Sequence, residues 1–188
     1  MWLTRARWGA LSNMASGFDL DLGMVRTGSS EGLYQALKFP DAPATQSAVL
    51  GAPTPKAAKR AARQHSAQAR ADWVRVRVHA MRWCLRVKAV QHPAFVAVLL
   101  QTGELPIVER SSRDDFWGAL PEAEGVLTGR NVLGRLLMEL RDEVRAWRVT
   151  PCLEPPGPAL GTLLGAPLPR VFPRQAALPG IAEHDGQE

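Results

Sequence analysis

Apolar residues recur at helical spacing along much of the chain. The clearest stripe lies in residues 131–147 and consists of Leu133, Leu136, Leu137, Leu140 and Val144. A stripe of this width is typical of a helix that packs one face against a core. Good helix formers and the end signals of helices predict further helices at residues 31–39, 56–64, 71–91 and 93–102.

Strand signals are shorter and fewer. Alternation or β-branched residues predict short strands at residues 18–22 and 106–109. The predicted fold class is therefore α+β, a predominantly helical single domain. The length of 188 residues is enough for one core and too short for two comfortable domains.

Two segments differ from this pattern. Residues 42–58 contain Pro43, Pro53 and Pro55 among small residues, which predicts a broken helix or a loop within the domain. From Thr150 onward the chain is rich in Pro and Gly, with Phe172 as its one aromatic residue. We therefore expect a domain over residues 1–149, followed by a loosely packed or disordered extension over residues 150–188.

Composition excludes several classes of protein. Hydrophobic residues make up 46% of the chain and charged residues 22%, which is ordinary for a globular protein. Cys84 and Cys152 form no CxxC motif and the four histidines form no HExxH, so no metal site is predicted. Without a signal peptide or a run of membrane-spanning length, we expect a cytoplasmic protein that does not bind a membrane. The formal charge of +5 is compatible with a phosphate-bearing or nucleic-acid partner, and equally with a compositional bias.

Two charged residues interrupt the apolar face of the predicted helix 71–91. That face contains Trp73, Val76, Ala80, Met81, Cys84, Leu85 and Val87. Arg77 and Lys88 fall inside the same arc, although a buried charge needs a partner. Lys88 could have a carboxylate partner, extend outward along its stem, or lie in a cleft as a reactive amine; Arg77 could hold a phosphate.

Two further segments combine residue types found in sites. Residues 109–118 (ERSSRDDFWG) bring acidic groups and hydroxyls beside Trp117, which fits a sugar site or, alternatively, a capped turn before a core tryptophan. Residues 129–135 (GRNVLGR) open a helix after a glycine. Free N–H groups there could bind an anion, and Asn131 could serve simply as the N-cap.

Six segments in order resemble the NADAR (YbiA-like) N-glycosidase family. They are WGALSNMA at 8–15, SSEGLYQALKFP at 29–40, AAKRAAR at 57–63, ADWVRVRVHAMRWCLRVKAVQHP at 71–93, LLQTGELPIVERSSRDDFWG at 99–118 and GRNVLGRLLMELRDE at 129–143. They cover about three-quarters of the chain. The sequence departs from the family pattern at Gly32, where His or Ala is more usual, and at Met14, where an aromatic residue usually follows LSN.

The resemblance implies an enzyme that hydrolyses a ribosyl C–N bond without a cofactor. By matching position, the implied catalytic residues are Lys88, Glu31 and Asp114. The implied substrate-binding residues are Trp73, Trp117, Arg77, Asn131, Gly134, Ser12 and Asn13. In the expected mechanism, Lys88 traps ribose C1 as a Schiff base, Asp114 or Glu31 moves the proton, the two tryptophans flank the sugar or base, and Arg77 and the helix start at Asn131 receive phosphate.

Three functions remain open at this point. The first is removal of ADP-ribose from a modified base such as guanine in DNA. The second is cleavage of phosphorylated ribosylamine intermediates of riboflavin biosynthesis. The third, of a different class, is a non-catalytic module that binds ADP-ribose or nucleic acid. The basic charge and the E-x-L-Y-Q-A motif favour the first.

Overall fold

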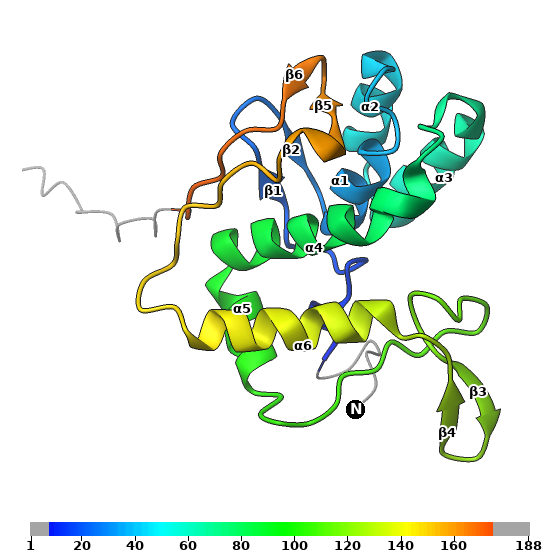
Figure 1. Ribbon diagram of the computed structural model, residues 1–188, viewed down its shortest axis with the longest axis vertical. Helices are drawn as coiled ribbons and strands as arrows, with labels where there is room; N and C mark the ends of the chain where they lie inside the picture. The colour runs from blue at the N-terminus through cyan, green and yellow to red at the C-terminus, as the bar shows by residue number, and fades with distance from the viewer. Residues whose placement is uncertain (1–7, 175–188) are drawn as a thin grey trace, which may run out of the picture.

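The fold is built around one long central helix, as the computed structural model, which describes residues 8–174, shows. In Figure 1 the helices that precede it in the chain lie above the central helix and the two that follow it lie below. The helices are α1 (Ser30–Ala36), α2 (Pro43–Leu50), α3 (Pro55–Gln64), the central α4 (Trp73–Gln91), α5 (Pro93–Leu100) and α6 (Val132–Arg145). The predicted helices 31–39, 56–64, 71–91, 93–102 and 131–147 are therefore confirmed, and the α+β class with them.

Proline and capping residues explain where the helices begin. Pro43, Pro55 and Pro93 occupy the first positions of α2, α3 and α5, where a missing N–H costs nothing. Thr54 caps α3 by accepting a hydrogen bond from the Ala57 N–H. Residues 42–58 thus contain a helix, a break and the start of the next helix, so the broken-helix alternative is the observed one.

Helices α4 and α6 run side by side in the same direction. Arg82 pairs with Glu139 and, one turn later, Arg86 pairs with Glu143, each at 2.9 Å. From the first pair to the second, both helices advance by four residues, so the two helices are parallel (Figure 1). These pairs are partly exposed and contribute little to stability, so the apolar stripe of α6 provides most of the attachment.

The strands form three two-stranded antiparallel hairpins. They are β1 (Leu20–Asp21) with β2 (Arg26–Thr27), β3 (Leu120–Ala123) with β4 (Val126–Thr128), and β5 (Thr162–Leu163) with β6 (Ala166–Pro167). The predicted strand at 18–22 is confirmed in β1. The one predicted at 106–109 is wrong as a strand, because an isolated bridge at Val108 is its only β pairing; the Asn131 side chain donates to the Ile107 carbonyl and accepts from the Glu109 N–H.

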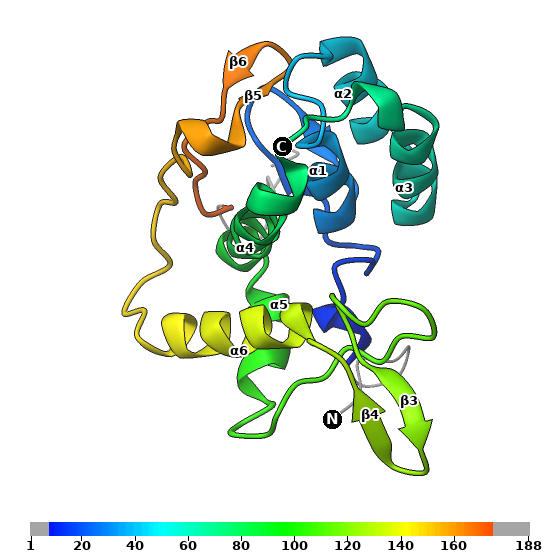
Figure 2. The same ribbon diagram turned by 45° about the vertical axis from the view of Figure 1, so that its right-hand side comes forward.

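The extension after residue 149 packs against the domain. Leu160, Leu163, Leu168 and Val171 are buried in the hydrophobic core, and β5–β6 lies against the end of α2 (Figures 1 and 2). The prediction of a loosely packed extension is therefore wrong for residues 150–174. Its few apolar residues suffice because they fill positions in an existing core and need no core of their own. Residues 175–188 lie outside the described part.

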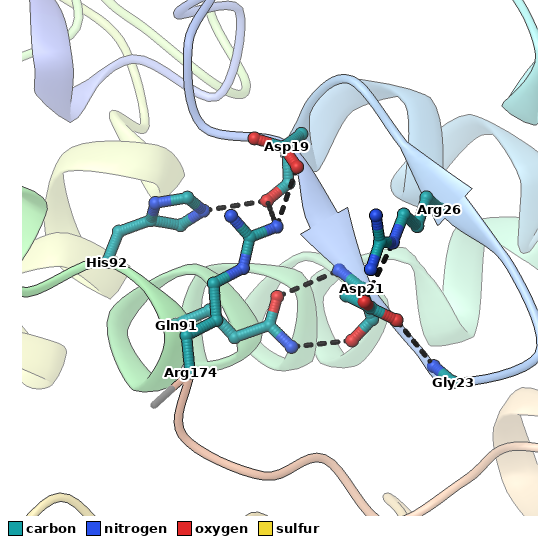
Figure 3. A network of polar contacts seen from close by, with 7 residues as sticks. All are labelled: Asp19, Asp21, Gly23, Arg26, Gln91, His92 and Arg174. Atoms are coloured by element: carbon teal, nitrogen blue, oxygen red, sulfur yellow. Dashed lines mark hydrogen bonds and ion pairs between the residues drawn. The ribbon is translucent and has the colours of Figure 1, made fainter. Parts of the chain in front are cut away.

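A polar network holds the far end of the extension to the start of the domain (Figure 3). Arg174 donates to both the side chain and the carbonyl of Asp19, at 2.7 Å each. The ring of His92 also contacts the Asp19 carbonyl, at 2.7 Å, and Gln91 bonds both backbone groups of Asp21. The N-terminal segment, the end of α4 and the extension are therefore joined at one place.

Candidate active site

A cavity of about 330 Å³ lies between α1, α4, the start of α6 and the loop of residues 109–118. Its polar lining combines acids, bases and amides: Glu31, Glu109, Asp114, Lys38, Lys59, Arg77, Asn13 and Gln35. Its apolar lining includes Tyr34, Trp73, Trp117, Met14, Met81 and Leu133. The cavity therefore offers carboxyl groups and flat apolar surfaces together, as a sugar site requires.

Glu31 is held by two amide side chains at the buried start of α1. Ser29 caps the helix by accepting a hydrogen bond from the Gly32 N–H at 3.1 Å. One carboxylate oxygen of Glu31 accepts from Gln35 at 2.7 Å, and the other accepts a short hydrogen bond from Asn13. Burial raises the pKa of Glu31, while the Gln35 hydrogen bond and the nearby lysines oppose that rise. Glu31 is thus a fixed carboxyl group whose protonation is easier than usual.

The departure from the family pattern at Gly32 has a local explanation. A Cβ atom at Gly32 would lie 2.5 Å from the hydroxyl oxygen of Thr27. Thr27 is buried in β2 and fills the space that a larger residue would need. The lack of a side chain at Gly32 therefore lets α1 pack closely against Thr27, while Glu31 on the same turn lines the cavity.

Glu109 is the site residue that the sequence analysis did not single out. Its side chain lines the cavity, and its Oε2 atom is buried with no hydrogen-bond partner among the described residues. Burial, aided by the charge of Asp114, raises the pKa of Glu109 to about 7. A carboxyl group that lines a cavity and keeps its proton in about half of the molecules at neutral pH is suited to general acid catalysis.

Asp114 organises the loop in addition to lining the cavity. One of its oxygens accepts hydrogen bonds from the backbone N–H groups of Phe116 and Trp117, at 3.1 and 2.8 Å. This cap fixes the turn that presents the Trp117 indole to the cavity. The capped-turn and sugar-site interpretations of this segment are therefore both compatible with the structure.

Aromatic rings form one wall of the cavity. Tyr34 packs between Trp73 and Trp117, with ring centroids 5.0 and 5.6 Å apart. Met14 also lines the cavity, so a thioether stands where the family pattern usually places a ring. The wall thus keeps three aromatic residues and replaces a further one by a flexible side chain.

Arg77 is anchored by stacking. Its guanidinium carbon lies 3.5 Å from the ring centroid of Phe116, while its buried Nε atom has no hydrogen-bond partner in the described part. Because it also lines the cavity, Arg77 has N–H groups to offer to a ligand. Its predicted role in binding an anion is compatible with this position.

Lys88 is buried, as the reactive-amine alternative requires, but the cavity lining does not include it. Its amine donates hydrogen bonds to the carbonyl oxygens of Ala10 and Ser12, at 2.6 and 3.1 Å. The same amine lies over the rings of Phe18 and Phe95, at 4.2 and 4.5 Å. In this arrangement the Lys88 amine thus lies outside the cavity lining, and its two hydrogen bonds go to backbone carbonyls.

Lys38 is the more deeply buried of the two amines that do line the cavity. It lies 5.5 Å from the ring centroid of Trp73 and 5.8 Å from that of Tyr34. Burial lowers the pKa of Lys38, Glu31 opposes the shift, and Lys59 adds to it. Glu31, Tyr34, Gln35 and Lys38 follow one another at i, i+3, i+4 and i+7, so helical spacing was the signal that could have identified Lys38.

Three predicted substrate-binding residues make contacts within the protein: Ser12, Asn131 and Gly134. Gly134 lies so close to the Ile107 carbonyl and the Asn131 side chain that no Cβ atom fits there. The hydroxyl of Ser12 accepts from the Met14 N–H. None of these three residues lines the cavity, whereas Asn13 does.

The start of α6 is also unavailable to an anion. The backbone N–H groups of residues 130–133 each donate to a carbonyl of residues 115–118, at 2.6 to 3.1 Å. A helix start binds anions through free N–H groups, which are occupied in this loop. The N-cap interpretation of Asn131 is therefore closer to its observed role, although its side chain bonds the 107–109 segment.

Residues 8–174 lack both a cluster of metal-binding side chains and a helix that could span a membrane. No group of three or more His, Cys, Asp or Glu side chains in this range is placed to hold a metal ion. No helix in this range is long and apolar enough to cross a membrane.

Comparison with known proteins places the site in a wider group. A family model described as the NADAR domain matches residues 3–145. The N-glycosidase YbiA of Escherichia coli is 36% identical over 116 residues, which cover 62% of this chain and 69% of that protein. A riboflavin biosynthesis protein of Vibrio vulnificus is 39% identical over 117 residues, which cover 62% of this chain but only 30% of the longer Vibrio protein.

The fold agrees with these matches. The NMR structure of Escherichia coli YbiA superposes with a TM-score of 0.67 and 31% sequence identity, covering 77% of this chain and 84% of that one. All the residues that line the cavity fall within the segment matched by the family model.

Proposed function

Because the chain belongs to the NADAR domain family, we propose that it is an N-glycosidase, an enzyme that hydrolyses the bond between ribose C1 and a nitrogen atom. The observation that carries this proposal is the cavity in which Glu31 and Glu109, two carboxyl groups with raised pKa values, face the same aromatic wall. The relatives named N-glycosidase support the reaction class.

In the proposed first step, the C1–N bond breaks. Glu109, whose raised pKa of about 7 keeps part of the enzyme protonated near neutral pH, donates its proton to the departing nitrogen. Positive charge that develops on the ribose is stabilised by the carboxylates of Glu31 and Asp114, and a tryptophan face covers the ring. The nitrogenous product then leaves in its protonated form.

In the second step, an amine captures C1. We assign this role to Lys38 in place of Lys88, since Lys38 lines the cavity and its lowered pKa favours the neutral amine. The Lys38 amine forms a bond to C1 and loses a proton to Glu31, and opening of the ring yields a Schiff base. Water then adds to C1, the C1–Nζ bond breaks, and the sugar leaves as its free aldehyde. The proton held by Glu31 replaces the one that Glu109 lost, so the net change is consumption of one water molecule.

Two substrates fit this proposal. The basic charge and the E-x-L-Y-Q-A motif favour ADP-ribose attached to a base, such as guanine in DNA. The Vibrio vulnificus relative is named a riboflavin biosynthesis protein, which supports the alternative, the phosphorylated ribosylamines of that pathway. Both are N-ribosyl compounds with phosphate on the sugar side.

The test is incubation with each substrate, followed by chromatography of the products. Free ADP-ribose released from the modified DNA supports the first substrate, and ribose 5-phosphate released from the ribosylamine supports the second. A Glu109→Gln variant serves as the matched control for enzyme-independent decay. Binding of either substrate without any release would show a binding module and would overturn the proposal.

A further inference from the structure

A second hollow adjoins the central cavity, between the end of α1, the helix α3 and the start of α4. Its volume is about 340 Å³. It shares Gln35, Lys38, Lys59 and Trp73 with the central cavity, so these four side chains stand on the boundary between the two spaces. A ligand bound in the central cavity can therefore extend into this hollow.

The charged lining of this hollow is entirely positive. Lys38, Lys59 and Arg63 line it, and no carboxylate does. In residues 8–174, none of these three cations is part of an ion pair. Other cations in this range, such as Arg70, Arg82 and Arg86, do have a carboxylate partner. The hollow thus gathers three cations that form no ion pair, with Glu31 of the central cavity as the carboxylate that acts on Lys38 and Lys59.

Helix α3 supplies two of the three cations, because one of its faces is turned toward the hollow. Its apolar side buries Ala58 and Ala62 against the core. Lys59 and Arg63, one turn apart, line the hollow, and the helix contains no acidic residue. Like charges at this spacing repel each other, so a bound anion would relieve an unfavourable contact.

We propose that this hollow is a phosphate subsite, in which Lys59 and Arg63 bind the phosphate ester of a substrate whose ribose lies in the central cavity. The proposal rests on the N-glycosidase function given above. The proposed reaction needs Lys38 as a neutral amine, whereas a nearby phosphate favours the charged form. The positive charges of Lys59 and Arg63 beside the phosphate oppose that effect. The ligand chemistry is a ribose phosphate, as a monoester or as the diphosphate of ADP-ribose.

Binding of three probes tests the subsite: ribose, ribose 5-phosphate and ADP-ribose, each titrated calorimetrically into the full chain. We expect both phosphate-bearing probes to bind at least tenfold more tightly than ribose, and the tighter of the two indicates whether the site fits a monoester or a diphosphate. The double variant Lys59→Ala/Arg63→Ala should weaken binding of the phosphate-bearing probes by about 10- to 100-fold. Ribose binding should not change.

The same helix provides a matched control. Lys56→Ala/Arg60→Ala removes the same charge from exposed positions that line neither hollow, and it should leave binding unchanged. Equal losses in the two double variants would show only a general effect of net charge and would overturn the subsite. Ribose binding as tightly as ribose 5-phosphate would overturn it as well.

Failure of the subsite can be distinguished from failure of the proposed function. If the enzyme cleaves phosphorylated and unphosphorylated N-ribosyl substrates with equal kcat/KM, the subsite is wrong and the glycosidase function stands. If no N-ribosyl substrate is cleaved but the phosphate-bearing probes bind and lose affinity in Lys59→Ala/Arg63→Ala, the subsite stands and the catalytic function is wrong.

Discussion

Lys88 donates a hydrogen bond of 2.6 Å to the carbonyl oxygen of Ala10, which lies 78 residues earlier in the chain. A second bond from the same amine, to the Ser12 carbonyl, fastens the turn that leads into Asn13. Asn13 in turn contacts Glu31 through both its side chain and its backbone. Lys88 is thus connected to the proposed active site through this turn, which makes it a positioning residue.

Lys88→Met should therefore lower kcat about tenfold or more without preventing folding. The substitution leaves two carbonyls without their donor, so the turn loses its anchor and Asn13 no longer holds Glu31 in place. Heteronuclear NMR should show the side-chain amide of Asn13 shifted in this variant. A wild-type kcat together with an unshifted amide would contradict the positioning role.

The titration of Lys88 gives a separate prediction about stability. Burial lowers the pKa of Lys88 from 10.5 to about 7, so between these values the unfolded chain binds a proton that the folded chain does not. The contribution of Lys88 to the free energy of unfolding must then rise with pH across this window. Urea unfolding at pH 7 and pH 9.5 should show this rise in the wild type and a smaller one in Lys88→Met.

Lys38, and not Lys88, should carry the covalent intermediate. Reduction with sodium borohydride during turnover should convert the Schiff base into a stable secondary amine. Peptide mapping by mass spectrometry should then find the sugar adduct on Lys38. Lys38→Met should form no adduct, whereas Lys88→Met should form the adduct more slowly at the same residue. An adduct on Lys88 would restore the assignment made from sequence.

Glu109→Gln should slow the reaction and stabilise the fold at alkaline pH. The amide cannot donate a proton as an acid does, so kcat should fall by about 10²- to 10⁴-fold. Because the folded-state pKa of about 7 lies above the ordinary value of 4.5, the wild type loses stability as pH rises between the two. The variant should avoid this loss, which we expect to be about 1 to 3 kcal/mol at pH 8.

The pH–rate profile checks the same assignment. With Glu109 as the acid, kcat/KM of the wild type should decline as pH rises through about 7. That decline should be absent from the residual activity of Glu109→Gln. An unchanged alkaline limb would assign the acid role to another group.

The extension should contribute measurably to stability through Gln46. This fully buried side chain donates to the Thr162 carbonyl at 2.9 Å and accepts from the Leu164 N–H at 2.6 Å. Gln46→Ala would leave these backbone groups unpaired and should lower the free energy of unfolding by about 2 to 4 kcal/mol. Gln64→Ala, at an exposed position, is the control. Equal midpoints of urea unfolding would show that β5–β6 is dispensable.

The helices could be predicted from the sequence because their information is local. In α4, for example, the apolar positions Val76, Ala80 and Cys84 repeat at helical spacing and are all buried. The packing of Leu160 and Val171 could not be predicted in this way, because a Pro- and Gly-rich segment shows no periodicity, and its contacts are long-range. The local pattern of apolar residues thus predicted the helices, but it did not predict where the extension packs.

The site was predicted in part for the same reason. Glu31, Asp114, Trp73 and Trp117 line the cavity as expected, since each belongs to a recognisable segment. Lys88 is buried, as one of its three open alternatives required, but which groups its amine meets depends on a turn 76 to 78 residues away. A helical wheel shows which face a residue lies on, and it does not show what covers that face.

Arg77→Lys should weaken substrate binding more than it slows the chemistry. The guanidinium carbon lies over the Phe116 ring, 3.5 Å from its centroid, and this contact restricts the direction of the N–H groups. A lysine keeps the charge but has no planar group to stack and no fixed fork of donors. We therefore expect KM to rise about tenfold while kcat changes less than threefold, since the acid and the amine remain in place. Arg75→Lys, on the exposed side of α4, should change neither constant. Should kcat fall in Arg77→Lys with KM unchanged, Arg77 would act on the transition state and not on substrate binding.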